Sequence, residues 1–224
     1  MLPRTRRIDE HHECHDHSAE DVECNKPWLQ APIVESDALP SLYSLKPKFQ
    51  QLLRPLAAAL SRTGVSANQV TVFAALASCC VGALVLTTGW YLVLPGFLFF
   101  RMALNAIDGL LAREFSLPTR LGAYLNELGD LLADAALTAP FVFLHPWVMG
   151  TTIVLAGVTE MAGVLSPSHR RNDGPLGKSD RALLYGAFAL WLGLGGTIPT
   201  WVPWIIVVLL SITIFNRVRQ GLAA

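Results

Sequence analysis

Apolar residues fill six long runs of the chain, and short polar breaks separate these runs. A helix needs roughly 20 mainly apolar residues to cross a bilayer. The pattern therefore predicts an all-α integral membrane protein with six transmembrane helices, at residues 70–88, 91–111, 121–144, 148–165, 182–194 and 202–215. The fifth run is short by this measure, unless its helix starts nearer Asp180 or ends nearer Thr197.

An amphipathic stretch precedes the first run. Residues 43–60 place apolar side chains at helical spacing among basic ones: Leu45, Phe49, Leu52, Leu53, Leu56 and Leu60 with Lys46, Lys48 and Arg54. This composition predicts an amphipathic helix in the cytoplasmic membrane interface; an ordinary juxtamembrane linker is the alternative. We thus expect a polar, disordered cytoplasmic tail at 1–40, the interfacial helix within 41–66 and a six-helix domain at 67–219.

Basic residues mark one set of the breaks and predict the orientation. They occur before the first run, between the second and third, between the fourth and fifth, and after the sixth. The other breaks, at 87–90, 145–146 and 195–203, contain no Lys, Arg, Asp or Glu. Because positive residues favour the cytoplasmic side, we expect a multi-pass protein of the cell's inner membrane with both termini in the cytoplasm.

The composition agrees with a membrane protein. Hydrophobic residues make up 52% of the chain and charged residues 15%, against about 25% charged residues in soluble domains. The net charge is zero, which argues against a nucleic-acid partner.

The N-terminal tail carries a cluster of potential metal ligands, His11, His12, Cys14, His15, His17 and Cys24. Their spacing fits no established zinc finger, so a disordered tail is the preferred interpretation and a separate metal site the alternative.

Two polar stripes interrupt the second and third runs. Steps of three and four residues place Arg101, Asn105, Asp108 and Ala112 on one helix face, and Gly122, Asn126, Asp130 and Asp134 on another. A short turn joins the two runs, so both stripes lie at the cytoplasmic ends of antiparallel neighbours. Oxygen donors from facing helices suit a hard cation such as Mg²⁺ or Mn²⁺. The stripes therefore predict a polar site in reach of both lipid and water.

The same residues carry a family resemblance. Asp108-Gly109-x-x-Ala112-Arg113, eight further residues and then Gly122-x-x-x-Asn126-x-x-x-Asp130 resembles the motif D-x-x-D-G-x-x-A-R-x8-G-x-x-x-D-x-x-x-D of the CDP-alcohol phosphatidyltransferases. Within that family the sequence is similar to YnbA-type members of enterobacteria. The resemblance covers residues 43–219. It implies a homodimeric membrane enzyme whose active site opens to the cytoplasm.

The resemblance assigns catalytic and metal-binding roles. It implies that Asp108 and Asp130 bind a divalent metal, Mg²⁺ or Mn²⁺, and that Asp130 also acts as the catalytic base. Asn105 and Asn126 stand where the motif has aspartate, so they offer neutral amide oxygens and lower the negative charge that attracts metal. Glu127 is either a further ligand or a structural partner of Arg101.

The resemblance also implies a nucleotide site. Residues 64–71 resemble the family's P-N-x-x-T segment through Asn68 and Thr71, with Ala67 in place of the proline. Asn68 either encloses the nucleotide or caps the first membrane helix. The remaining residues predicted to bind CDP are Gly109, Ala112, Arg113 and Gly122, of which Arg113 would neutralise the pyrophosphate.

The segment 168–181 is a candidate site for the acceptor. Its cations Arg170, Arg171, Lys178 and Arg181 are placed like the basic residues that hold the acceptor's phosphate in relatives; positive-inside anchoring is the alternative. Glu160 is a lone carboxylate of the fourth run, and we expect it to approach Glu127 or Asp134 of the third.

These features predict a phospholipid-synthesising transferase. It would move a phosphatidyl group from CDP-diacylglycerol to a hydroxyl of a phosphorylated alcohol and release CMP. One alternative is an enzyme that uses a CDP-linked small alcohol with diacylglycerol. The other is a degenerate family member that binds nucleotide or lipid without turnover, as the two asparagines suggest.

Overall fold

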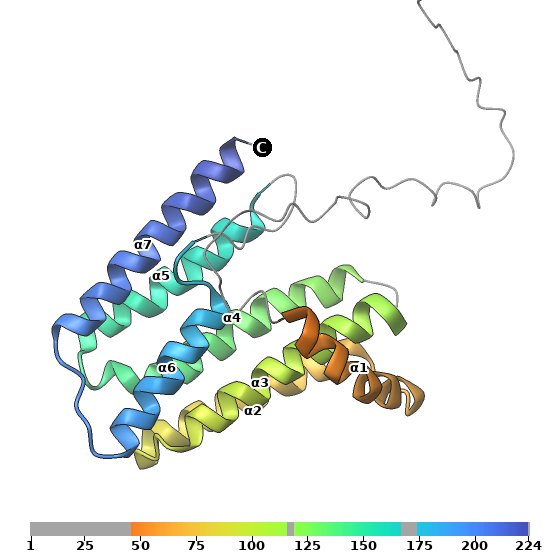
Figure 1. The fold of residues 1–224 in the computed structure, drawn as a ribbon, viewed down its shortest axis with the longest axis horizontal. Helices are drawn as coiled ribbons and strands as arrows, with labels where there is room; N and C mark the ends of the chain where they lie inside the picture. Colours follow the sequence, from red (N-terminus) through yellow and green to blue (C-terminus); the bar gives the residue numbers. More distant parts are fainter. Residues whose placement is uncertain (1–45, 116–118, 167–173, 224) are drawn as a thin grey trace, which may run out of the picture. The chain divides into compact units, whose positions relative to one another are not determined.

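The computed structural model describes residues 46–115, 119–166 and 174–223. No strand occurs among these residues, which form α1 Lys46–Arg62, α2 Ala67–Thr88, α3 Val93–Leu110, the π-helical segment η3 Leu111–Phe115, α4 Arg120–Val142, α5 Pro146–Val164, α6 Lys178–Gly193 and α7 Trp201–Leu222 (Figure 1). Each predicted run coincides with one helix, from α2 to α7, so the all-α prediction is confirmed. The predicted tail at 1–40, with its His and Cys cluster, lies outside the described residues.

Four of the described helices are long and apolar enough to cross a membrane: Ala67–Thr88, Val93–Phe115, Pro146–Val164 and Trp201–Leu222. The two remaining predicted membrane helices, α6 and α4, do not meet these criteria, for different reasons. α6 has 16 residues and is about 24 Å long, less than the hydrocarbon core. α4 is 23 residues long but carries Glu127, Asp130 and Asp134 within its length. The crossing of the bilayer by α4 and α6 stays a prediction.

Capping residues fix the start of α2 and of α4. The Ser66 hydroxyl accepts from the backbone N–H of Gln69 at 3.3 Å, and the Gln69 side chain accepts from the backbone N–H of Ser66 at 2.9 Å. The alternative that Asn68 caps this helix is therefore wrong, since Ser66 is the N-cap residue and forms a capping box with Gln69. At α4 the Thr119 hydroxyl accepts from the N–H of Gly122 at 3.0 Å. Both caps lie beside candidate site residues.

Small residues let α2 and α4 approach closely. A Cβ atom on Gly82 of α2 would lie 2.3 Å from the backbone oxygen of Ala136 of α4. One on Gly129 of α4 would lie 3.4 Å from the Ala75 methyl group of α2. Between helices in a bilayer there is no hydrophobic driving force, so close van der Waals packing is a main source of their association. The contact between α2 and α4 is of this kind.

We expect Gly82→Ala to lower the stability of the bundle, because the added methyl group forces the two helix backbones apart. Overpacking of this kind costs about 1–3 kcal/mol. Gly96→Ala is the matched control, since a Cβ there meets nothing within 4 Å. Thermal unfolding in detergent should show a lower midpoint for Gly82→Ala alone. Equal midpoints for the two variants would contradict the described packing.

α1 packs across the ends of α2 and α3. Ala57 is fully buried beside Val70, Ile107, Leu110 and Leu111, and the Arg54 guanidinium forms an ion pair with Glu114 of η3 at 2.8 Å. The opposite face of α1 exposes Leu52 and Leu56. The helix is thus present where an amphipathic helix was predicted, while its location in the membrane interface stays a prediction.

Exposed tryptophans collect at the helix ends that lack charged residues. They are Trp90, Trp147, Trp191, Trp201 and Trp204. Tryptophan favours the boundary between hydrocarbon and headgroups. This distribution agrees with the predicted orientation, in which the basic helix ends face the cytoplasm.

Candidate active site

α3 ends in a π-helical turn next to the motif. The segment η3 contains Arg113, and a Cβ atom on Gly109 would lie 3.4 Å from a guanidinium nitrogen of Arg113. Gly109 therefore leaves the space along which the Arg113 side chain lies. π-Helical turns are frequent at functional sites. The sequence pattern did not predict this one.

Asp108 of α3 faces α2. It is 6% exposed, and its Oδ2 accepts a hydrogen bond from the Thr71 hydroxyl at 3.0 Å. The same hydroxyl lies 3.1 Å from the Ala67 carbonyl oxygen, so its single hydrogen is shared. The two predicted site residues Thr71 and Asp108 are thus direct neighbours, and Thr71 orients the carboxylate.

Asn68 of α2 lies against the start of α4. A Cβ atom on Gly122 would lie 2.7 Å from the side-chain oxygen of Asn68. Because Gly122 has no side chain, there is room for the Asn68 amide. A larger residue at position 122 would displace that amide. The structure thus brings together Asn68 and Gly122, two residues predicted to bind the nucleotide from separate parts of the sequence.

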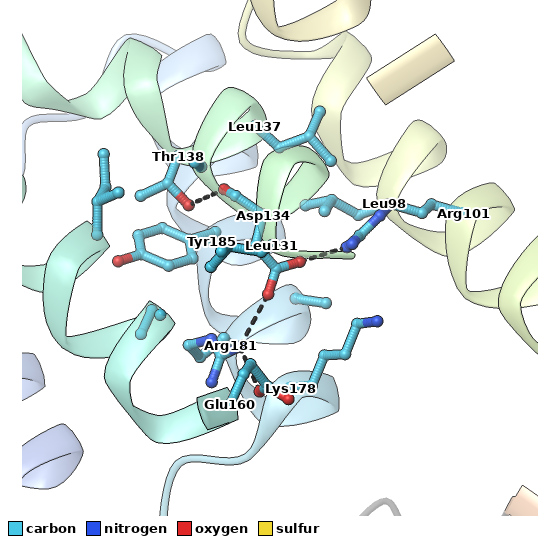
Figure 2. A pocket seen from close by; sticks show the side chains of 15 residues that line it. Leu98, Arg101, Leu131, Asp134, Leu137, Thr138, Glu160, Lys178, Arg181 and Tyr185 are labelled. Carbon is cyan, nitrogen blue, oxygen red and sulfur yellow. Dashed lines mark hydrogen bonds and ion pairs between the residues drawn. The ribbon is translucent and has the colours of Figure 1, made fainter. Parts of the chain in front are cut away.

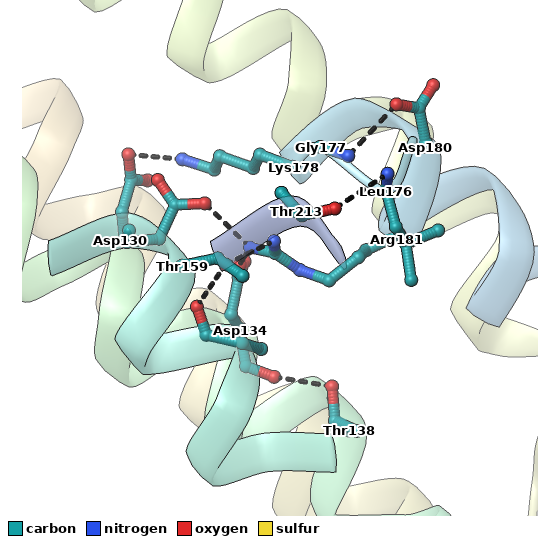
Figure 3. A network of polar contacts seen from close by, with 12 residues as sticks. Asp130, Asp134, Thr138, Thr159, Leu176, Gly177, Lys178, Asp180, Arg181 and Thr213 are labelled. Carbon is teal, nitrogen blue, oxygen red and sulfur yellow. Dashed lines mark hydrogen bonds and ion pairs between the residues drawn. The ribbon is translucent and has the colours of Figure 1, made fainter. Parts of the chain in front are cut away.

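Asp130 of α4 is held from two other helices. Its Oδ1 accepts from the amide nitrogen of Asn105 at 3.1 Å and lies 3.4 Å from a guanidinium nitrogen of Arg101, both on α3. Its Oδ2 forms an ion pair with the ammonium of Lys178 of α6 (Figure 3). The predicted base and a predicted ligand of the acceptor phosphate are therefore in direct contact.

Lys178 owes its position to the way α6 begins. Leu176 is buried among Ile206 and Leu210 of α7, and its backbone N–H donates to the Thr213 hydroxyl at 3.2 Å. The backbone N–H of Gly177 donates to Asp180 at 3.0 Å. The fifth run does start nearer Asp180, so Lys178 and Arg181 belong to the first turn of α6 instead of to a loop.

Beneath Asp130 lies a chain of buried charges of alternating sign, made of Arg101, Asp134, Arg181, Glu160 and Arg217. Nitrogen–oxygen distances are 2.6 Å for Arg101–Asp134, 2.8 Å for Arg181–Asp134 and 2.9 Å for Arg181–Glu160 (Figure 2). The distance for Arg217–Glu160 is 4.0 Å. Its members come from five helices, α3 to α7. Buried charges need partners of this kind, so the chain ties the helices together below the site.

The buried charge chain bears on two expectations, for Glu160 and for Arg101, and includes one residue, Arg217, whose burial was not predicted. Glu160 does approach Asp134, through the shared Arg181. The ion pairs of Arg101 shown by the structure reach Asp130 and Asp134, further along α4 than the proposed partner Glu127. Arg217 was counted only among the basic residues of the last break, yet its side chain is 2% exposed. Its place in the sequence, at the end of the sixth apolar run, did not indicate that the side chain is buried.

A small cavity of about 30 Å³ lies between α3, α4, α5 and α6 (Figure 2). Arg101, Asp134, Lys178 and Arg181 line it with apolar residues such as Leu98. This volume is of the order of one water molecule. The cavity thus lies within the buried charge chain, with Lys178 at its lining.

The predicted acceptor residues have different surroundings. Arg170 and Arg171 lie outside the described residues. Arg181 is 3% exposed, and its guanidinium already binds Asp134, Glu160 and the hydroxyl of Thr159. The Lys178 side chain is 24% exposed and lies on the side of Asp130. Of the two described cations, Lys178 is the one that a ligand reaches more easily.

The donor groups can hold a hard cation only if amide oxygens take part. Within the described ranges, no three His, Cys, Asp or Glu side chains gather closely enough to hold a metal ion. The predicted set offers the carboxylates of Asp108, Asp130 and Glu127 and the amides of Asn105 and Asn126. These are oxygen ligands of the kind Mg²⁺ and Mn²⁺ prefer. The donor chemistry is compatible with such an ion, for which Asn105 would have to turn its oxygen towards Asp130 in place of its nitrogen; that the set binds one belongs to the proposal below.

Comparison with known proteins identifies the relatives. Residues 64–214 match the family described as CDP-alcohol phosphatidyltransferase. The inner membrane protein YnbA of Escherichia coli K12 is 41% identical over 197 residues, which cover 81% of this chain and 96% of YnbA. A phosphatidylinositol phosphate synthase of Mycobacteroides abscessus is 35% identical over 105 residues, 46% of this chain and 47% of that protein.

Solved structures show the same fold. Phosphatidylinositol phosphate synthase PgsA1 of Mycobacterium tuberculosis with CDP-DAG bound has a TM-score of 0.63 and 21% identity, and the match covers 76% of this chain and 94% of that one. The same enzyme in complex with manganese and citrate has a TM-score of 0.64 at 21% identity, over 75% of this chain and 88% of that one.

Proposed function

Since the chain belongs to the CDP-alcohol phosphatidyltransferase family, we propose that it moves the phosphatidyl group of CDP-diacylglycerol onto an alcohol hydroxyl. The observation that supports this most is the contact between Asp130 and Lys178. It sets a candidate base beside a candidate ligand of the acceptor phosphate. The donor is suggested by the related PgsA1, which binds CDP-DAG, and the acceptor by the basic start of α6.

The proposed reaction is a substitution at the phosphorus that carries the lipid. The acceptor oxygen forms a bond to that phosphorus, the bond to the CMP oxygen breaks, and CMP leaves. Asp130 accepts the proton of the acceptor hydroxyl. Arg113, beside Gly109, neutralises the pyrophosphate and then the charge that develops on CMP.

A divalent cation is part of the proposed site. The proposed ligands are Asp108, Asp130, Asn105, Asn126 and Glu127, and Mg²⁺ or Mn²⁺ is the proposed ion; PgsA1 was solved with manganese. When bound, the ion would stabilise negative charge on the phosphate oxygens. Asn68, Thr71, Gly109, Ala112 and Gly122 would enclose CDP.

The position in the membrane completes the proposal. Six helices, α2 to α7, would cross the inner membrane with both termini in the cytoplasm, and α1 would lie in the cytoplasmic interface. The segregation of exposed tryptophans from the basic helix ends supports this orientation. A homodimer is the proposed assembly, by analogy with the family.

A second candidate function rests on Asn105. Its amide donates a hydrogen bond to Asp130, so the protein's own groups, without a metal ion, stabilise the charge of that carboxylate. This arrangement would suit a family member that binds CDP-lipid without turnover. A third arrangement, with a CDP-linked small alcohol as donor and diacylglycerol as acceptor, leaves the basic start of α6 without an anion to bind.

Identification of the lipid product tests the proposal. Purified protein in detergent would be incubated with Mg²⁺, CDP-diacylglycerol and one alcohol or phosphorylated alcohol at a time, and in a parallel series with a CDP-linked alcohol and diacylglycerol. The lipids would then be separated and their masses determined by mass spectrometry. We expect a new phospholipid that contains one of the phosphorylated acceptors. A product formed only from a CDP-linked alcohol and diacylglycerol would reverse the assignment of donor and acceptor.

Thr71→Val is expected to reduce this activity by about 10- to 100-fold, the usual effect of losing a partner that orients a ligand. Valine has a similar shape but cannot donate to Asp108. Thr71→Ser keeps the hydroxyl and should retain most of the activity. Initial rates of product formation in the three proteins check this, and full activity of Thr71→Val would show that the hydrogen bond to Asp108 is dispensable.

A further inference from the structure

The two motif carboxylates have different electrostatic surroundings. Asp130 is in contact with two cations, Arg101 and Lys178, and accepts the amide N–H of Asn105. Asp108 accepts a hydrogen bond from the neutral hydroxyl of Thr71, and none of the ion pairs between described residues includes it. The site therefore contains one carboxylate in ion pairs with two cations and one that, among the described residues, forms no ion pair and feels the charge of Lys178 only from further away.

Asn105 is part of this difference. Its amide nitrogen lies 3.1 Å from Oδ1 of Asp130, where it stabilises the negative charge. An aspartate at the same position would place a second carboxylate against the first, and the two charges would repel each other unless a cation stood between them. The asparagine removes the need for that cation.

Lys178 supplies the positive charge instead. It reaches Asp130 from α6, whose start is fixed by the Asp180 cap and by the packing of Leu176 on α7. The side chain is 24% exposed and that of Asp130 is 13% exposed, so the pair is only partly screened by solvent. The ammonium thus supplies a positive charge directly at Oδ2 of Asp130.

Resting on the function proposed above, we propose that Lys178 is the built-in counter-ion of Asp130, so that the site binds one divalent cation, at Asp108, and no second one at Asp130. Asp108 is 6% exposed, and a buried carboxylate needs a compensating charge. In this proposal the amide oxygens of Asn105 and Asn126, whose nitrogens donate to Asp130 and Glu127, complete the ligands of this single ion. This inference removes Asp130 from the ligands named in the proposed function and leaves it the role of base.

Direct measurement of Mn²⁺ binding tests this inference. The purified full-length protein in detergent would be titrated with Mn²⁺ alone, without lipid substrate, and free Mn²⁺ read from its electron paramagnetic resonance signal. We expect one Mn²⁺ per wild-type chain and loss of that binding in Asp108→Asn. Two ions per chain, or unchanged binding in Asp108→Asn, would overturn the proposal.

Variants at Lys178 separate its specific role from a general effect of charge. Lys178→Met should admit a second Mn²⁺ or tighten binding by about 10-fold or more, because Asp130 loses its counter-ion. Lys178→Arg keeps the charge and should bind one ion as the wild type does. Arg62→Met removes an exposed cation at the end of α1 and serves as the matched control.

Two results at Lys178 would refute its role. One is a Lys178→Met protein that binds Mn²⁺ like the wild type, and the other is an equal gain in Arg62→Met. If Lys178→Met does not fold, the wild-type stoichiometry still decides the number of ions. The readout is independent of turnover, so it stands whether or not the protein releases CMP.

Discussion

Replacing Asp130 by asparagine is expected to reduce CMP release by about 100- to 10,000-fold, the usual contribution of a positioned general base. Asparagine keeps the size of the side chain but cannot accept the proton of the acceptor hydroxyl. The substitution also leaves the ammonium of Lys178 without its carboxylate. Rates of CMP release from CDP-diacylglycerol, at saturating acceptor, measure the effect.

Asp180→Asn is the matched control for this experiment. It is the same substitution in the first turn of α6, where the side chain accepts from the backbone N–H of Gly177, and asparagine can still accept that bond. We expect its activity to stay within a few-fold of the wild type. Comparable rates for Asp130→Asn and the wild type would exclude Asp130 as the base.

Asp134→Ala is expected to have the largest effect on stability. Asp134 lies between two buried guanidinium groups, those of Arg101 and Arg181, and its loss leaves both short of negative charge. Removing one partner from a buried ion pair typically costs about 3–5 kcal/mol. The midpoint of thermal unfolding in detergent should therefore fall strongly, and the yield of folded protein with it.

The exposed ion pair of α1 offers the contrast. Glu114→Ala breaks the pair with Arg54, whose side chain is 59% exposed, and surface pairs contribute about 0–1 kcal/mol. We expect this variant to unfold near the wild-type temperature. If Asp134→Ala were equally mild, the buried charge chain would not be what holds α3, α4 and α6 together.

The sequence predicted the helices because they depend on local patterns, whereas the roles of the site residues came from the resemblance to the family and stay a proposal. Apolar runs of spanning length located α2 to α7, and the spacing of Asp108, Asn126 and Asp130 placed these residues on facing helix ends. The side-by-side position of Asn68 and Gly122 agrees with their joint prediction as nucleotide ligands. A repeat of polar residues at helical spacing places side chains on one helix face without knowledge of the packing, but it assigns them no ligand.

Local patterns could not predict the ion-pair partners of the charged residues, because these partners depend on how helices far apart in the sequence pack together. Arg181 looked like a free cation of a basic loop, yet α4 and α5 each supply it with a carboxylate. Arg217 resembled a residue that only marks the cytoplasmic side. Asn68 was considered as a cap because asparagine is a good capping residue, but the cap is formed by Ser66, two residues earlier. The π-helical turn at Arg113 likewise has no local signature.

The central claim is that this chain turns over CDP-lipid, and a single-turnover experiment tests it most directly. CDP-diacylglycerol would be bound to purified full-length protein with Mg²⁺, and CMP measured per bound lipid after each alcohol or phosphorylated alcohol is added. The account predicts that bound CDP-diacylglycerol is converted to CMP only when an acceptor is present. CDP-diacylglycerol that stays bound, with no CMP from any acceptor, would contradict it and identify a lipid-nucleotide binding protein.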